Sequence, residues 1–218
     1  MGLSCACPIT TLPTLSNVSC PTDFDQIVKL GFTLAKTTPD FSGTVGNEIV
    51  NETAWVTLLS AVGNTKIQVS PAIANLTIPA SEMSTIGGND NSTVDGMRYY
   101  VGEDNVTVNF EIHSATPDVI AAMDPLSCLS DATLGGSQLT VFMFSRAIRG
   151  NSTVVSKAGA GPDEYKGIPV FNVRFSTVSS EGYNSKNKYM GSMDFKANDL
   201  RDIVATQVPF SPFALINP

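Results

Sequence analysis

The chain has 218 residues, of which 42% are apolar and only 15% are charged, and its formal net charge at pH 7 is −7. This length allows one domain with a sizeable core, and the acidic balance argues against a nucleic-acid-binding groove. No stretch approaches eighteen apolar residues, so we expect no membrane-spanning helix and no contact with a membrane. Neutral polar residues replace the missing charge, which fits either a β-rich protein that packs against copies of itself or an acidic surface β-domain.

Residues 1–22 are predicted to form an extended arm, because prolines are spread among serines and threonines without a regular period. The arm has no basic region and no long apolar core, so we expect no signal peptide. Cys5, Cys7 and Cys20 leave two interpretations open. Their spacing does not match a zinc site, and free thiols in a reducing compartment are the alternative.

Residues 23–207 are predicted to form a single β-rich domain. Strands are expected at about 27–36, 65–70, 99–101, 105–113, 138–145, 152–157, 167–177 and 188–196, separated by turn-forming residues. A helix capped by Asn51 buries Trp55 and ends at Gly63. Residues 71–97 are predicted to be a long connection, as a flexible loop or hairpin, and such segments are usually functional or bound by a partner.

Residues 105–124 contain the clearest pattern in the chain. Apolar and polar residues alternate strictly from Val106 to His113, which indicates a strand with one buried face. A short helix follows, with Thr116 as N-cap and Pro117 at its first position, and Pro125 is expected to stop it.

The C-terminal half predicts two further features. Residues 138–145 are apolar on both faces, with Phe142 and Phe144 on one side, so this strand is either central and covered or part of a subunit interface. Residues 167–196 form a long hairpin, with Phe171, Val173 and Phe175 expected on one face. Residues 208–218 are predicted to be an extended tail that lies across its own or a neighbouring subunit.

Taken together, the fold class is α+β and mainly β: an antiparallel β-sandwich or barrel-like domain with one or two short helices, a long loop and extended terminal arms.

We find no catalytic constellation in the sequence, and we expect neither an enzyme nor a bound cofactor or metal. The single histidine, His113, is expected beside Glu111 on the polar face of its strand, and no Gly-x-Ser-x-Gly or phosphate-binding loop occurs. The acids of residues 90–95 do not match a calcium loop. Six Asn-x-Ser/Thr sequons begin at Asn17, Asn51, Asn75, Asn91, Asn105 and Asn151, and we interpret them as a result of polar composition.

Part of the sequence resembles known virion proteins. The segment Cys20-Pro-Thr-Asp-Phe-Asp-Gln-Ile27 looks like the opening of virion proteins from tailed phages of Bacteroidetes-type hosts. The helix around Trp55, the strand at residues 65–71 and the Gly87-Gly88 turn fit the same resemblance. The arrangement of elements is similar to the tail tube proteins of phages and contractile injection systems.

The resemblance implies a structural subunit of the virion, assembled in the host cytoplasm, whose partners are its own copies and other virion proteins. Such subunits stack as rings, typically hexameric, around a lumen through which DNA passes without binding. Residues 71–97 would contact the next ring, and the arms at 1–22 and 208–218 would lock neighbours. The candidate contacts between subunits are Ile86, Gly87, Gly88, Phe142, Phe144, Tyr183, Phe210 and Phe213.

Two other classes of function stay open at this point. One is another part of the virion, such as a capsid decoration or head–tail connector protein. The other is a surface adhesin or carbohydrate-binding module, which would use exposed aromatic residues such as Tyr183.

Overall fold

The computed structural model describes residues 26–88, 97–113, 116–131, 138–146, 152–179 and 187–218. Its strands are β1 (Ile27–Leu34), β2 (Ile67–Val69), β3 (Ile73–Thr77), β4 (Met83–Ile86), β5 (Tyr99–Glu103), β6 (Val106–His113), β7 (Leu139–Ser145), β8 (Ser152–Ala158), β9 (Tyr165–Lys166), β10 (Ile168–Phe175), β11 (Lys188–Phe195) and β12 (Ile203–Val208). Its helices are α1 (Glu52–Ser60), α2 (Pro117–Met123), α3 (Pro125–Leu129) and α4 (Ala197–Arg201). The predicted arm, residues 1–22, and Tyr183 lie outside the described residues.

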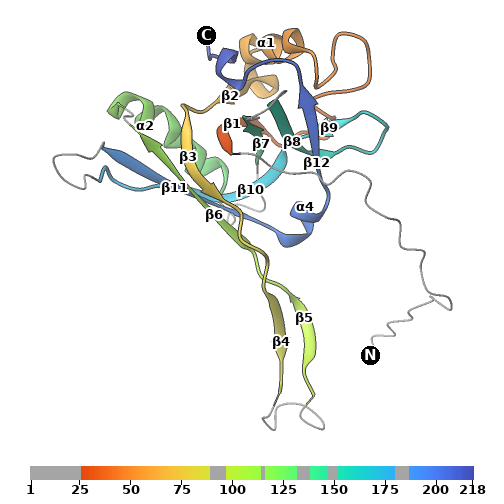
Figure 1. Cartoon of the computed structure of the whole chain (residues 1–218), viewed down its shortest axis with the longest axis vertical. Helices are drawn as coiled ribbons and strands as arrows, with labels where there is room; N and C mark the ends of the chain where they lie inside the picture. Colours follow the sequence, from red (N-terminus) through yellow and green to blue (C-terminus); the bar gives the residue numbers. More distant parts are fainter. Residues whose placement is uncertain (1–25, 89–96, 114–115, 132–137, 147–151, 180–186) are drawn as a thin grey trace.

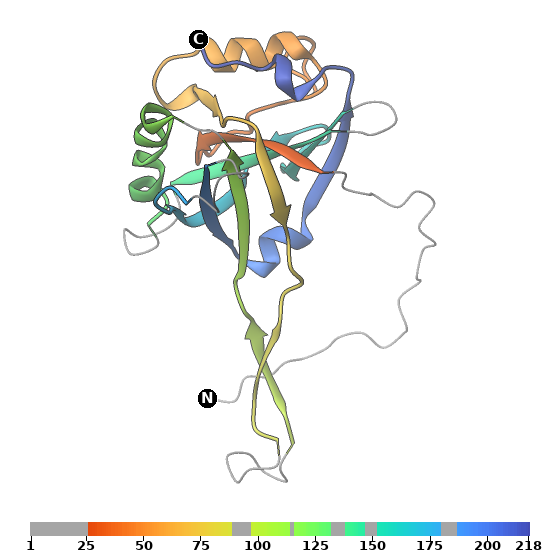
Figure 2. The same ribbon diagram turned by 60° about the vertical axis from the view of Figure 1, so that its left-hand side comes forward.

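The strands form two packed layers that share β10 (Figures 1 and 2). In the first layer, β1 pairs along one edge of β7, while β10 and β8 pair with successive parts of its other edge. β2 extends this layer beyond β1, and β12 extends it beyond β8, while β9 pairs with the last residues of β8 on the edge that β7 also uses. The second layer consists of β10, β11, β6 and β3. Since all these pairs are antiparallel and one core cluster fills the space between the layers, the predicted mainly β sandwich is confirmed.

β7 is buried on both faces within one subunit. Leu139, Val141 and Met143 face the core between the layers, whereas Phe142 and Phe144 face a second core on the opposite side. All five side chains are at most 2% exposed. Of the two explanations that the sequence allows for this strand, the structure therefore supports the central position.

The second core forms around the single tryptophan, Trp55 of α1. Its ring centroid lies 4.3 Å from that of Phe41, 5.3 Å from Phe142, 5.0 Å from Phe144 and 6.4 Å from Phe210. The indole Nε1–H donates to the carbonyl oxygen of Ile49 at 2.8 Å, so the polar atom of this buried ring is satisfied. α1 begins as predicted, because the side chain of Asn51 accepts from the backbone N–H of Thr53.

The C-terminal tail lies across its own subunit. Val208, Phe210 and Leu215 are buried in the second core. Asn217 then acts as a short substitute for a strand: the Val69 N–H donates to its Oδ1 at 2.8 Å, and its Nδ2 donates to the Val69 carbonyl at 2.7 Å. The tail thereby covers part of the outer edge of β2.

The second layer is built on β6, whose burial alternates as its sequence predicts. β6 pairs with β11 along its whole length, and Phe110 lies directly opposite Gly191. A Cβ atom at position 191 would lie 2.2 Å from Cζ of the Phe110 ring. The ring therefore occupies the space that any larger residue at position 191 requires.

We expect Gly191→Ala to lower the free energy of unfolding by about 1–3 kcal/mol, the usual cost of overpacking a core. Chemical denaturation followed by circular dichroism measures this change. Combining it with Phe110→Leu removes part of the blocking ring, so the double variant should be less destabilised than the two single variants together. Strictly additive effects would show that the ring does not press on Gly191.

α2 ends at Met123, before Pro125, as predicted, and Pro125 then occupies the first position of α3, where proline fits well. Two local predictions are wrong. α1 ends at Ser60, before Gly63, which instead starts a short 3₁₀ turn with a φ of 68°. The predicted turn at residues 102–104 is also displaced, since β5 continues to Glu103.

Phe171 does not share a face with Val173 and Phe175. The pairing of β10 with β11 shifts between Phe171 and Arg174, and Asn172 has a φ of 50°. This bulge reverses the alternation, so that Val173 faces the core and Phe171 the outside, where Lys196 Nζ lies 4.8 Å from its ring centroid.

The connection predicted at residues 71–97 is not one loop. Residues 73–77 form β3 and pair with β6, and residues 83–86 form β4 and pair with β5. Figure 1 shows that β4 and β5 project from the body as a separate ribbon. The hairpin alternative is thus confirmed for this part of the segment.

Candidate assembly surfaces

The projecting hairpin, here defined as the described residues 78–88 and 97–104, is the feature that sets this fold apart from a plain sandwich. β4 and β5 pair with one another and with no other described strand. The paired residues are Met83 with Glu103, Ser84 with Gly102, Thr85 with Tyr100 and Ile86 with Tyr99. Beyond Ile86, Gly87 and Gly88 have φ values of 87° and 107°, which glycine tolerates at little cost.

One ion pair joins the base of the hairpin to the body, between Glu103 and Arg201 at the end of α4. Within the hairpin, the backbone N–H of Asp104 donates to the carbonyl of Glu82 at 3.0 Å, which links its two strands at the base. An apolar hollow of about 320 Å³ lies beside this base, lined among others by Ile78 and Leu200.

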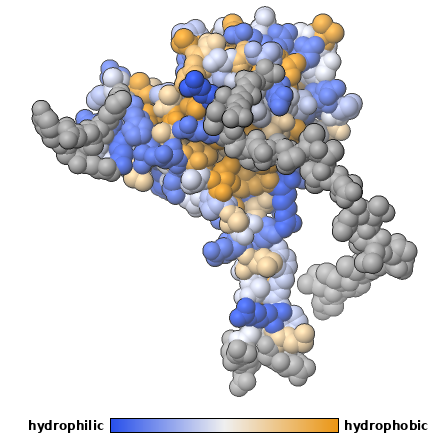
Figure 3. Space-filling model, viewed as in Figure 1, coloured by the Kyte–Doolittle hydropathy of each residue, from blue (hydrophilic) through white to orange (hydrophobic). Residues whose placement is uncertain are grey.

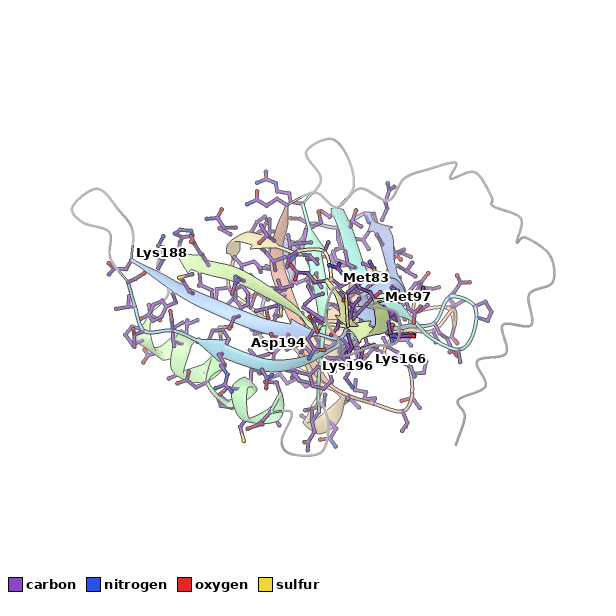
Figure 4. The ribbon with its side chains drawn as sticks, turned by 90° about the horizontal axis from the view of Figure 1, so that it is seen from below. Met83, Met97, Lys166, Lys188, Asp194 and Lys196 are labelled. Atoms are coloured by element: carbon purple, nitrogen blue, oxygen red, sulfur yellow. The ribbon has the colours of Figure 1, made fainter. Side chains whose placement is uncertain are left out.

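The hairpin exposes large apolar side chains on both faces. Tyr99, Tyr100 and Val101 are 52%, 60% and 58% exposed although they are consecutive in one strand and so point to alternate faces. The exposed large apolar residues of the hairpin are Ile78, Met83, Ile86, Met97, Tyr99, Tyr100 and Val101. Figure 3 shows pale orange patches on the mostly blue and white surface of the hairpin, and Figure 4, which views the molecule from below, shows Met83 and Met97 close together in projection. A two-stranded ribbon is only marginally stable alone. Exposed apolar side chains gathered on such a ribbon are typical of a surface that binds another chain.

A second group of exposed apolar residues lies at the opposite end of the molecule. We call it the cap surface: Val45, Val50, Val56, Val62, Phe213 and Ile216. These residues belong to α1, to the segments next to it and to the C-terminal tail, which Figures 1 and 2 place at the end away from the hairpin. Only two of the fifteen exposed large apolar residues described, Val178 and Met190, lie outside the hairpin and the cap surface.

A groove of about 360 Å³ borders the cap surface, between α2, β2 and the C-terminal tail. Its walls are mostly apolar and include Val69, Met123 and Ile216. The side chain of Lys29 also lines it, donating from Nζ to the carbonyl of Leu215 at 2.8 Å. Burial lowers the pKa of Lys29 below its ordinary value, because the charged ammonium group loses hydration.

The eight sequence-predicted contact residues fall into different environments. Ile86 is 54% exposed on the hairpin next to Gly87 and Gly88, and Phe213 is 42% exposed on the cap surface. Phe142 and Phe144 are fully buried and Phe210 is 7% exposed, so these three rings pack in the core of their own subunit and do not reach a neighbour. The prediction of inter-subunit contact is therefore wrong for them, and Tyr183 lies outside the described residues.

Sequence reasoning missed most of the apolar hairpin residues. The run Tyr99-Tyr100-Val101 carried a usable signal, because it places large side chains on both faces of a short strand. The cap residues carried none, since single exposed apolar residues are normal on protein surfaces.

His113 takes part in a polar network on the outer face of the second layer. Its Nε2 lies 3.3 Å from Glu111, as the alternation of β6 predicts. Glu111 also accepts from Asn75 Nδ2 at 3.0 Å and lies 3.5 Å from Lys188 Nζ. Figure 4 shows Lys188 at the far end of β11 from Asp194. The network links β3, β6 and β11, and the four residues named here include no serine, threonine or cysteine.

No family of proteins, curated protein or solved structure matches this chain in sequence or fold comparisons. Within the described residues, no group of three or more His, Cys, Asp or Glu side chains is arranged to hold a metal ion. Among the helices that the structure describes, none has the length and apolar character needed to cross a membrane.

Proposed function

We propose that this protein is a self-assembling structural subunit of a virion, and specifically of a phage tail tube through which DNA passes. The observation that carries the proposal is the projecting hairpin, which exposes seven large apolar side chains and whose strands β4 and β5 pair with no other described strand. A surface of this kind is costly to expose in water unless another chain covers it.

The sheet edges support lateral association into a ring. β3 and β12 end the path of paired strands, so each has one edge that no described strand occupies. Unpaired edges favour pairing with another chain, and a closed ring of copies removes both edges at once. The proposed ring would be hexameric, as the resemblance implies.

The charge balance fits passage of DNA. A net charge of −7 repels the phosphate backbone, so a lumen lined by such subunits would let DNA slide without sticking. Other virion proteins would then bind the two ends of the tube.

Negative-stain electron microscopy of the purified chain, with light scattering on the same sample, tests the proposal. We expect rings or tubes of uniform bore. A monomer that persists at high concentration would overturn spontaneous tube assembly, and would favour a capsid decoration protein or a binding module.

A further inference from the structure

We infer that the groove beside the C-terminal tail binds a free fatty acid, whose carboxylate pairs with Lys29 and whose aliphatic chain lies along the apolar walls. This site belongs to a single subunit. It goes beyond the proposed assembly and does not depend on it.

The walls of the groove provide the apolar part of the site. Its volume of about 360 Å³ lies within the range of about 300–1,000 Å³ that is usual for ligand pockets. β1, β2, the helices α2 and α3 and the C-terminal tail all contribute residues to it. The larger apolar side chains that line it are Phe32, Val69, Val119, Met123, Leu126 and Ile216. Because most of these are aliphatic, the groove suits a hydrocarbon chain.

Lys29 provides the polar part of the site. It is the one charged residue among the described residues that line the groove, and it is only 9% exposed. A lysine is rarely so buried without a paired carboxylate. Its Nζ donates to the carbonyl of Leu215 at 2.8 Å, and no described acidic side chain forms an ion pair with it. Since an ammonium group carries three N–H donors, Lys29 retains donors for the carboxylate of a ligand.

The surroundings of Lys29 favour this pairing. Burial lowers the pKa of Lys29, because the ammonium group loses hydration and no described carboxylate replaces it. A bound carboxylate supplies an opposite charge at this point, which favours the charged form of the lysine. A charge-assisted hydrogen bond in a partly dehydrated groove is also stronger than the same contact in water.

Four carboxylates on α1, on α2 and on residues next to them act against an anion, namely those of Glu48, Glu52, Asp118 and Asp124. None of them lines the groove, and the last three are exposed. Their repulsion passes through solvent, where salt screens it over about 10 Å at 0.1 M. The contact with Lys29 is buried and is screened much less. Direct pairing therefore decides which head group binds, while the surrounding acids weaken the binding of an anion mainly at low salt.

Three ligands of one chain length separate the head group from the chain: octanoate, 1-octanol and octylammonium. Titration calorimetry of the purified full chain measures their dissociation constants. We expect octanoate to bind about 10-fold or more tightly than 1-octanol, which is the usual effect of a hydrogen bond to a charged group. Octylammonium should bind more weakly than octanoate, although the surrounding acids alone predict the opposite order.

Two variants test the position of the ligand. Lys29→Met removes the ammonium group and keeps an unbranched side chain, so it should erase the preference for octanoate and leave the binding of 1-octanol nearly unchanged. Ala122 is exposed and lines the groove, so Ala122→Glu adds a carboxylate there without altering Lys29. It should weaken the binding of octanoate at least about 10-fold. Circular dichroism checks that each variant keeps its fold.

The matched control is Ala121→Glu, which adds the same charge to the preceding residue of α2. Ala121 is exposed but does not line the groove, so this variant should bind octanoate like the wild-type chain. Equal effects of the two glutamate substitutions would place the ligand outside the groove and overturn the inference.

Two other results also overturn it: octanoate that binds no more tightly than 1-octanol, and a Lys29→Met variant that keeps the preference for octanoate. Electron microscopy measures self-assembly separately. Rings or tubes that bind no octanoate overturn only the fatty-acid site, whereas a persistent monomer that binds octanoate overturns only the proposed assembly.

Discussion

Replacing Ile86, Tyr99 and Tyr100 together by threonine is expected to abolish the association that depends on the hairpin, while leaving the domain folded and the edges of β3 and β12 unchanged. These side chains are 54%, 52% and 60% exposed, so their removal costs the isolated subunit little. Threonine keeps the preference of the ribbon for extended structure. Central aromatic and aliphatic anchors contribute about 2 kcal/mol or more each, so the loss of three should weaken association at least about a thousandfold. Light scattering and electron microscopy measure the change.

The matched control alters exposed apolar residues elsewhere. Val178→Thr with Met190→Thr removes side chains that are 49% and 46% exposed but lie on the β10–β11 side of the domain. This control should assemble like the wild-type chain. Equal loss of assembly in both variants would show that general surface hydrophobicity, and not the hairpin, drives association.

Sequence patterns predict the parts of this fold in which the preference of a segment for strand or helix agrees with the place that the segment takes in the folded domain. β6 is one example: Val106, Val108, Phe110 and Ile112 alternate with polar residues, and the structure buries those four. α1 is another, because Asn51 supplies the cap and Trp55 the anchor within one short segment. In such segments the residues that decide the structure lie next to each other in the chain.

Other parts depend on contacts between distant segments. Phe142 and Tyr100 both belong to strands with large side chains on two faces, and sequence alone does not separate them. Phe142 is covered because α1 and the C-terminal tail fold over β7, whereas no described element covers Tyr100. The bulge at Asn172 is equally hidden, since asparagine adopts a positive φ at modest cost but does so only where the neighbouring strand demands it.

This difference explains which candidate contact residues the sequence indicates. The hairpin residues Ile86, Gly87 and Gly88 were predicted from a long, turn-rich connection, which is a local signal. The groove was not predicted, because its walls come from β1, β2, α2 and the last residues of the chain. No sequence window contains a surface that three-dimensional packing creates.

Trp55→Ala should be the most destabilising single substitution proposed for this protein. Trp55 is fully buried, and its ring contacts a set of four phenylalanines that join α1, β7 and the tail. Removing a buried tryptophan side chain typically costs about 3–5 kcal/mol. The carbonyl of Ile49 also loses its donor, and a buried unpaired group adds about 1–3 kcal/mol. Domains are stable by only about 5–15 kcal/mol, so this loss removes much of the free energy of unfolding. Chemical denaturation followed by circular dichroism measures it.

Two companion substitutions test whether the cost comes from the buried cluster. Trp55→Phe keeps an aromatic ring but removes the donor to Ile49, so it should cost clearly less than Trp55→Ala. Val56→Ala alters the next residue of the same helix, which is 50% exposed, and should change the free energy of unfolding by no more than about 0.5 kcal/mol. Destabilisation by Trp55→Ala that is no greater than by Val56→Ala would contradict the second core. In that case the tail and α1 would not be joined through this ring, and the groove that the tail borders would lose its support.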